Sequence, residues 1–236
     1  MRVKLPTPCS LCGEPILKKD ELTGEHVPPK LFHPKSMRPN IRKQLWKVPS
    51  HKVCNESYRE DEEYLCFFLA GMVFNQNQEM GRIILADLKE RANAHPPTMG
   101  LVRRLIHAFK NITPGGVHLP PGHFHILPDM VRIQNVVLKI AQCIYFKDQN
   151  KHLPRVWCKH IELCKTPDDF QPLFELMIHA KPVSVVPEVF SYRHLCVDGT
   201  HLYTLLFWEG FAFCLAFDDP DFKGTTLSQR TSKTKK

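Results

Sequence analysis

The stretch HKVCN at residues 51–55 decides how the first part of this chain folds, because it repeats the spacing of CSLCG at residues 9–13. Each stretch carries two metal-binding side chains with two residues between them, Cys9 and Cys12 in the first and His51 and Cys54 in the second. Three thiolates and one imidazole with this repeated gap form a ligand set that tetrahedral zinc favours. Two unrelated thiol pairs in a loop-rich region are the alternative, but the paired spacing favours a structural zinc site.

The segment between the two halves needs such a site in order to fold. Between Lys4 and Val53 there are few large apolar residues and many proline, lysine and arginine residues. This composition buries too little surface to offset the conformational entropy that folding removes. A structural zinc ion can contribute about 10–16 kcal/mol of apparent binding free energy that is coupled to folding. We therefore expect all four zinc positions to be filled by protein, with Gly13 taking the positive φ of the first turn.

The stretch GEHVPPK at residues 24–30 lies between the two zinc-binding halves and holds a candidate catalytic pair. The carboxylate of Glu25 is a hard oxygen ligand that suits Mg²⁺ or Mn²⁺. The imidazole of His26 has an ordinary pKa close to neutrality, so it can serve as a general base. Consecutive strand residues point to opposite faces, so the turn fixed by Pro28 and Pro29 must set the geometry of this pair.

Asn55 follows the last zinc thiolate directly and opens a segment with the pattern of a helix. In NESYREDEEYLCFFLAGMVF the acidic residues come first and an apolar run follows, as in a helix that enters a core. Because zinc would fix Cys54 near the start of this helix, we expect the Asn55 amide to point back across the hairpin.

CSLCG, GEHVPP and HKVCN, in this order, resemble the HNH endonucleases. The whole arrangement also resembles a bacterial and phage HNH subfamily with a zinc knuckle, a Glu-His-Val-Pro-Pro stretch and a Cys-Asn helix followed by Asp-Glu-Glu-Tyr. The resemblance covers about residues 7–66 and implies a zinc-stapled ββα-metal module. It also implies roles for three residues: His26 is the general base, while Glu25 and Asn55 bind a catalytic Mg²⁺ or Mn²⁺ ion. The implied activity is metal-dependent hydrolysis of DNA phosphodiester bonds.

One position departs from the pattern of that family. The middle asparagine of the motif stands nine residues before the last motif residue, where this chain has Trp46. In the family that asparagine holds the loop that orients the catalytic histidine, and Asn40 is a candidate substitute. The departure favours an alternative function, a zinc-stapled nucleic-acid-binding module that is catalytically weak or inactive. A third alternative is a nuclease or toxin that acts on RNA.

The net charge of +8 is concentrated at the two ends of the chain. Residues 1–60 contain 12 Lys and Arg against 6 Asp and Glu, and residues 225–236 add 4 basic residues. A basic patch that coincides with a chemical site favours a polyanionic partner, because neutralised phosphates release counterions. A solvated basic face is the alternative for any single residue. The predicted contacts position phosphates rather than read bases; they are Lys30, Arg38, Arg42, Lys43, Lys47 and Arg59.

After residue 75 the pattern changes to helices and then to strands. Apolar periodicity predicts amphipathic helices at 80–94, 99–111 and about 130–146, and a further helix begins after the cap Thr166. The runs VFSYRHLCV, HLYTLLFW and FAFCLAF, separated by Asp198-Gly199 and Glu209-Gly210, predict a three-stranded antiparallel meander.

The predicted fold class is therefore α+β, with the zinc-stapled module first, a helical segment next and the meander last. The predicted domains are the module at 1–75, an accessory domain at 76–224 and a disordered basic tail at 225–236.

Other features of the sequence bear on the localisation of the protein and on its remaining cysteines and histidines. No stretch approaches about 18 consecutive apolar residues, so we expect no membrane span. The first residues lack the apolar region of a secretory signal, which predicts a cytoplasmic protein with reduced thiols. Five further cysteines are predicted to be ordinary thiols: Cys143, Cys158, Cys164, Cys196 and Cys214. The histidines of GGVHLPPGHFHILP are predicted to lie in a proline-rich connector rather than a metal site; they are His118, His123 and His125.

Overall fold

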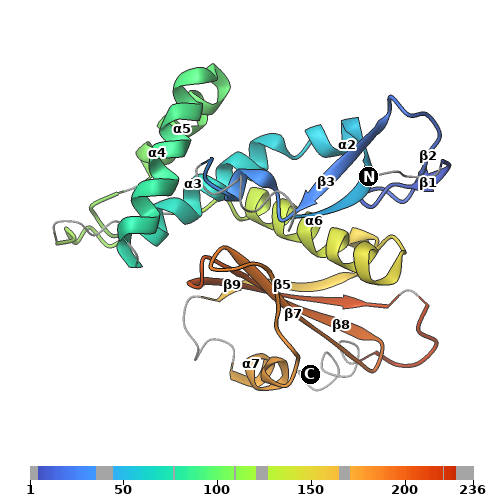
Figure 1. The fold of residues 1–236 in the computed structure, drawn as a ribbon. Helices are drawn as coiled ribbons and strands as arrows, with labels where there is room; N and C mark the ends of the chain where they lie inside the picture. The colour runs from blue at the N-terminus through green and yellow to red at the C-terminus, as the bar shows by residue number, and fades with distance from the viewer. Residues whose placement is uncertain are drawn as a thin grey trace.

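The first part of the chain folds as a strand hairpin that leads directly into two helices (Figure 1). The hairpin strands pair antiparallel, with Glu25 opposite Val48 and His26 opposite Lys47. A smaller hairpin beside it carries the first metal-binding stretch. The elements are β1 (Thr7–Pro8), β2 (Pro15–Ile16), β3 (Leu22–Val27), η1 (Lys30–Phe32), β4 (Trp46–His51), α2 (Lys52–Glu56) and α3 (Arg59–Gln76). This computed structural model describes residues 5–35, 45–76, 78–108, 110–120, 127–164, 171–219 and 221–226.

Three more helices follow, and their positions agree with the apolar periodicity of the sequence. They are α4 (Gln78–Ala94), α5 (Pro96–Ala108) and α6 (Met130–Gln149). The carboxylate of Asp129 caps α6 by accepting a hydrogen bond from the backbone N–H of Arg132, and Asn150 ends the helix in the left-handed conformation. None of the described helices combines the length and the apolar character needed to span a bilayer.

The last part of the chain forms an antiparallel sheet with the strand order β5-β9-β8-β7-β6. It therefore contains the predicted three-stranded meander and two further strands. The elements are η2 (Arg155–Trp157), β5 (Cys158–Cys164), α7 (Gln171–Ile178), β6 (Val183–Val186), β7 (Phe190–Val197), β8 (Thr200–Phe207) and β9 (Phe211–Asp218). The first turn has two residues as predicted, Asp198 and Gly199, both at positive φ. The second turn has three, because Phe207 pairs with Phe211.

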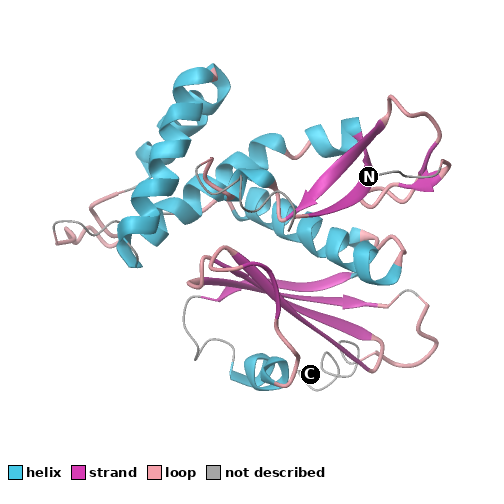
Figure 2. Cartoon of the chain, in the orientation of Figure 1, coloured by secondary structure: helices cyan, strands magenta, loops and turns pink. Residues whose placement is uncertain are grey.

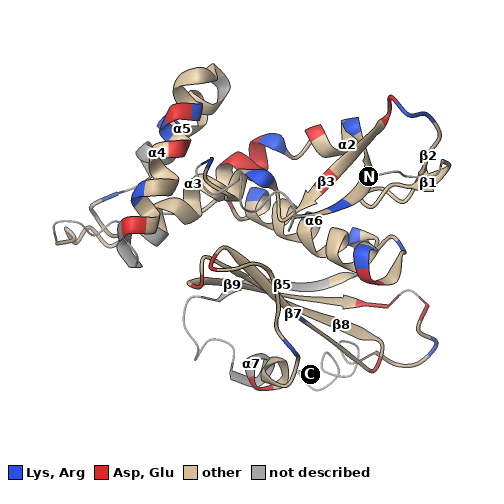
Figure 3. Cartoon of the chain, viewed as in Figure 1, with Lys and Arg blue, Asp and Glu red and all other residues tan. Residues whose placement is uncertain are grey.

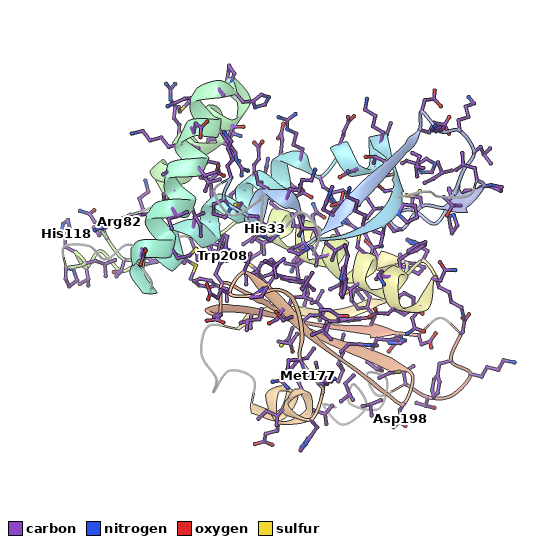
Figure 4. The ribbon with its side chains drawn as sticks, viewed as in Figure 1. His33, Arg82, His118, Met177, Asp198 and Trp208 are labelled. Atoms are coloured by element: carbon purple, nitrogen blue, oxygen red, sulfur yellow. The ribbon has the colours of Figure 1, made fainter. Side chains whose placement is uncertain are left out.

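Helix α6 lies between the hairpin and the sheet (Figures 1 and 2). It contacts α3, β3 and β4 on one side, while Tyr145 meets His201 of β8 edge-on at 5.1 Å on the other. One hydrophobic cluster of buried residues runs from Ile16 through α6 to Phe217. Helix α7 packs on the opposite face of the sheet, where Met177 lies against Leu202 (Figure 4).

The segment after β3 also joins the hairpin to the sheet. Phe32 packs against Phe207 at 5.2 Å and against Trp208 at 6.0 Å between ring centroids. Figure 4 labels His33 and Trp208 in this region. The described core thus continues across residue 76, where the predicted module and accessory domain meet.

Some predictions fall on residues outside the described ranges. They are the helix cap Thr166, His123 and His125 of the proline-rich stretch, and the tail from residue 227 onward.

Candidate functional site

Cys9, Cys12, His51 and Cys54 come together as the spacing predicts. Their ligand atoms all lie within 4.8 Å of one another. Nδ1 of His51 is 3.4 Å from Sγ of Cys12 and 3.9 Å from Sγ of Cys54. A tetrahedral zinc ion, with bonds of about 2.3 Å to sulfur and about 2.0–2.1 Å to nitrogen, would hold such atoms about 3.6 Å apart. The group can therefore hold a metal ion such as zinc.

Backbone contacts hold the first metal-binding stretch in place. Gly13 has a φ of +83° and its N–H donates to the carbonyl of Cys9 at 2.9 Å. A Cβ atom at Gly13 would lie 2.8 Å from the ring of His152, so glycine is required both by φ and by space. The N–H of Ser10 donates to the carbonyl of Pro49 in β4 at 2.9 Å. The turn is thus attached to β4 and to the segment after α6.

Without a nearby positive charge, the thiols of this group resist ionisation. Burial, together with the neighbouring Cys9 and Cys12, raises the pKa of Cys54 to about 12. Burial also raises the pKa of Cys12. A divalent cation supplies the positive charge that a set of thiolates needs, and a coordinating thiol is deprotonated outright. The chemistry of the donor set therefore fits zinc.

Two of the predicted catalytic residues, Glu25 and Asn55, meet at the side chain of Lys139 from α6. Nζ of Lys139 lies 2.9 Å from Oε2 of Glu25 and donates to Oδ1 of Asn55 at 3.2 Å. It also donates to Oε1 of Glu62, near the start of α3, at 2.5 Å. The aromatic ring of Tyr58 lies 5.0 Å from the same nitrogen. One ammonium group thus joins the hairpin, α2, α3 and α6.

This charged cluster is buried. The side chains of Lys139 and Glu25 are 1% and 4% exposed, and that of Glu62 is 15% exposed. Burial raises the pKa of Glu62 to about 7, against the lowering effect of Lys139. Burial also raises the pKa of Glu25. For Lys139 burial opposes the charge, but the two carboxylates raise its pKa above the ordinary value, so the lysine is an ammonium.

His26 does not share this cluster. It follows Glu25 on the regularly paired strand β3, so its side chain points to the opposite face. Glu25 is buried, whereas His26 is half-buried. Burial, together with the positive charges of Lys30 and Lys47, lowers the pKa of His26 to about 4. His26 is therefore neutral near pH 7.

The residues around Lys139 do not fit a catalytic Mg²⁺ or Mn²⁺ ion as they stand. The oxygens of Glu25 and Asn55 are the predicted ligands, and both are directed at Nζ of Lys139. A divalent ion at about 2.0–2.1 Å from these oxygens would occupy the space that the ammonium fills. A divalent ion and the ammonium group of Lys139 therefore cannot occupy this site together.

A basic pocket of about 420 Å³ opens next to this cluster. Figure 3 shows that charged residues gather on the hairpin and the helices, whereas the sheet is largely uncharged. Glu62 belongs to both the pocket wall and the buried cluster. The wall contains cations from the segment after β3, from α3 and from α4; the lining residues are Lys30, Leu31, Lys35, Arg59, Glu62, Glu63, Arg91, Ala94, His95 and Thr98.

Ion pairs and hydrogen bonds organise the pocket wall. Nη2 of Arg59 lies 3.4 Å from Nε2 of His95, whose Nδ1 is 2.9 Å from the hydroxyl of Thr98. That hydroxyl donates to Glu63 at 2.8 Å.

The opposite side of the wall is tied to α4. Lys35 pairs with Glu90 at 2.6 Å, and Arg91 pairs with Asp87. These contacts fix the basic groups relative to one another.

Of the other residues predicted to contact phosphate, the structure describes only one. Lys47 lies on β4 opposite His26, while Arg38, Arg42, Lys43 and the candidate substitute Asn40 fall outside the described residues. Trp46, at the position of the family's asparagine, packs edge-on against Tyr192 at 5.8 Å. It therefore connects the hairpin to the sheet.

Sequence reasoning missed Lys139 and Glu62. The usable signal was a lysine within the apolar stripe of 130–146, flanked by Val136, Val137 and Ile140. Comparison with protein-family models, curated proteins and solved structures gave no match. The functional interpretation therefore depends on the geometry described above.

Proposed function

We propose that this protein binds the phosphate backbone of nucleic acid through its zinc-stapled hairpin and the basic pocket beside it. The observation that carries the proposal is the pocket, in which four cationic side chains from three segments of the chain converge. Two of them, Lys30 and Arg59, are among the residues that the sequence predicts to contact phosphate. The net charge of +8 favours the same class of partner.

The wall of the pocket suits phosphate. The side chain of Arg59 is 62% exposed although it lies 3.6 Å from Glu63, so its guanidinium can still reach a ligand. Arginine binds phosphate oxygens with two parallel hydrogen bonds, and lysine binds them as a point charge. Contacts of this kind position a backbone without reading its sequence. We therefore expect affinity for many nucleic-acid sequences.

Binding without cleavage is the form of the proposal that the geometry favours. Glu25 and Asn55 are engaged by Lys139, and His26 lies on the other face of β3. The presence of Trp46 at the position of the HNH asparagine also favours binding without cleavage.

Hydrolysis by an HNH-type endonuclease is the second candidate, and the strand-strand-helix order around Glu25, His26 and Asn55 favours it. In that reaction neutral His26 would take a proton from the attacking water.

Fluorescence anisotropy with a short labelled DNA duplex tests the proposal. Lys30→Ala and Arg59→Ala should each weaken binding to a similar extent for unrelated sequences, and each should lower the salt slope by about 1. Lys181→Ala removes an exposed lysine just before β6 and should leave binding unchanged. Absence of binding by the wild type, or equal losses in all three variants, would contradict the proposal. A matched RNA ligand distinguishes the two kinds of nucleic acid.

A plasmid assay separates the two candidates. We expect supercoiled DNA incubated with the protein and Mg²⁺ or Mn²⁺ to remain supercoiled. Conversion to nicked or linear DNA that disappears in His26→Ala would instead support the hydrolase.

A further inference from the structure

The side chain of Lys139 occupies the place where the HNH resemblance implies a metal ion. Its Nζ is the shared partner of Glu25, Glu62 and Asn55, at distances of 2.9, 2.5 and 3.2 Å. The sequence predicts two of these three residues as ligands of a divalent ion. The two predicted ligands thus surround a positive charge, but that charge is the ammonium group of a protein side chain and not a metal ion.

We propose that the ammonium group of Lys139 is the resident cation of this centre and excludes Mg²⁺ and Mn²⁺ from it. The three oxygens are of the hard type that both ions prefer. The ammonium group contacts them at 2.5–3.2 Å, and no room remains beside it for an ion bound at about 2.0–2.1 Å.

The lysine is held in this position by its helix. Lys139 lies one turn from Val136 and next to Ile140, both fully buried in the core, and its own side chain is 1% exposed. The N-cap at Asp129 and the left-handed Asn150 fix both ends of α6. Moving the ammonium group to solvent would leave Glu25 and Glu62 buried without a cation, and unpaired buried charges are strongly unfavourable.

This inference goes beyond nucleic-acid binding, because it concerns a cation centre that the pocket does not need in order to hold phosphate. The two proposals therefore fail separately. Loss of nucleic-acid binding in Arg59→Ala says nothing about Lys139, and Mn²⁺ binding can be measured without any nucleic acid.

Mn²⁺ titration of the zinc-loaded protein, followed by electron paramagnetic resonance and isothermal titration calorimetry, tests the inference. Wild type and Lys147→Ala, which removes an exposed lysine of the same helix, should bind no Mn²⁺ at this centre. Lys139→Ala should gain one equivalent of bound Mn²⁺, because it leaves three oxygens around a space of the right size. Adding Glu25→Gln to Lys139→Ala should abolish the gained site.

Two results would overturn the inference. One is an equivalent of Mn²⁺ bound by the wild type and lost in Glu25→Gln, which would mean that the ion displaces the ammonium group. The other is a folded Lys139→Ala variant that gains no site. If Lys139→Ala folds only when Mn²⁺ is present, the inference is supported, since the ion then replaces the missing charge. If the variant does not fold in either condition, the wild-type titration decides.

Discussion

His194 and His201 form a hydrogen-bonded pair on the sheet face that packs against α6. Nε2 of His194 lies 2.9 Å from Nδ1 of His201, and the ring of His194 stacks on Tyr203 at 4.4 Å. Burial, together with the neighbouring His201, lowers the pKa of His194 from 6.5 to about 4. Burial also lowers the pKa of His201, although Asp219, 3.6 Å away, opposes this. Both rings are therefore neutral near pH 7.

The low pKa of His194 predicts a loss of stability in acid. The unfolded chain takes up a proton near pH 6.5 and the folded chain only near pH 4, so the free energy of unfolding falls as the pH falls between these values. His194→Gln removes the titrating ring and keeps a hydrogen-bonding group. Between about pH 7 and pH 4.5, the wild type should lose about 2 kcal/mol more than this variant in urea unfolding. The exposed His179→Gln should follow the wild type; equal losses in all three proteins would contradict the assignment.

Individual site residues were predictable where the signal was local. The Cys/His group that could hold a metal ion was predictable because its spacing repeats, whereas the catalytic roles of Glu25, His26 and Asn55 stay predictions that come from short motifs. Lys139 could not be found in this way, because it lies 84 residues from Asn55 in the chain and within an apolar helical stripe. Its partners are brought to it by the packing of α6 against α3 and the hairpin, which no local pattern encodes.

Turns and strands, too, could be predicted only where the sequence carries a local signal for them. The turn at Asp198-Gly199 was predictable because a two-residue hairpin needs positive φ at both positions, which this pair tolerates. The turn after β8 was not, because Trp208 and Glu209 adopt positive φ without a sequence signal for it. Strands β5 and β6 were missed because VSVV is too short to show a period and CKHIELC does not alternate regularly between apolar and polar residues.

The metal-binding turns predict how the N-terminal elements depend on zinc. Cys54→Ser removes one thiolate and should abolish the one equivalent of bound zinc that we expect native mass spectrometry to detect in the wild type. It should also lower the free energy of unfolding by several kcal/mol, because a structural zinc ion held by this group would contribute on the order of 10–16 kcal/mol of apparent binding free energy coupled to folding. The control is Cys196→Ser, an exposed thiol of β7, which should keep its zinc. Zinc retained at full stoichiometry in Cys54→Ser would exclude Cys54 as a ligand.

The molecule as a whole is organised around α6, which serves as a shared wall for the hairpin and the sheet. Lys139 faces the hairpin side, while Tyr145 contacts His201, and Asp148 accepts a hydrogen bond from Tyr192 at 3.2 Å, on the sheet side. Trp46 and Phe32 extend the same core directly between the two parts. Unfolding of one part would therefore expose apolar surface of the other, and we expect both parts to unfold in one transition.

Ile140 offers a direct test, since it is 1% exposed within α6 and belongs to the shared core. Ile140→Ala should lower the free energy of unfolding by about 2–5 kcal/mol through the cavity it creates. The urea midpoint for zinc release, followed with a chromogenic chelator, should fall together with the midpoint for loss of sheet circular dichroism. Val131→Ala, at a 69% exposed position of the same helix, should shift neither. If zinc release kept its wild-type midpoint while the sheet unfolded earlier, residues 1–75 would be an independently folding module, because only a self-contained core could survive the loss of α6.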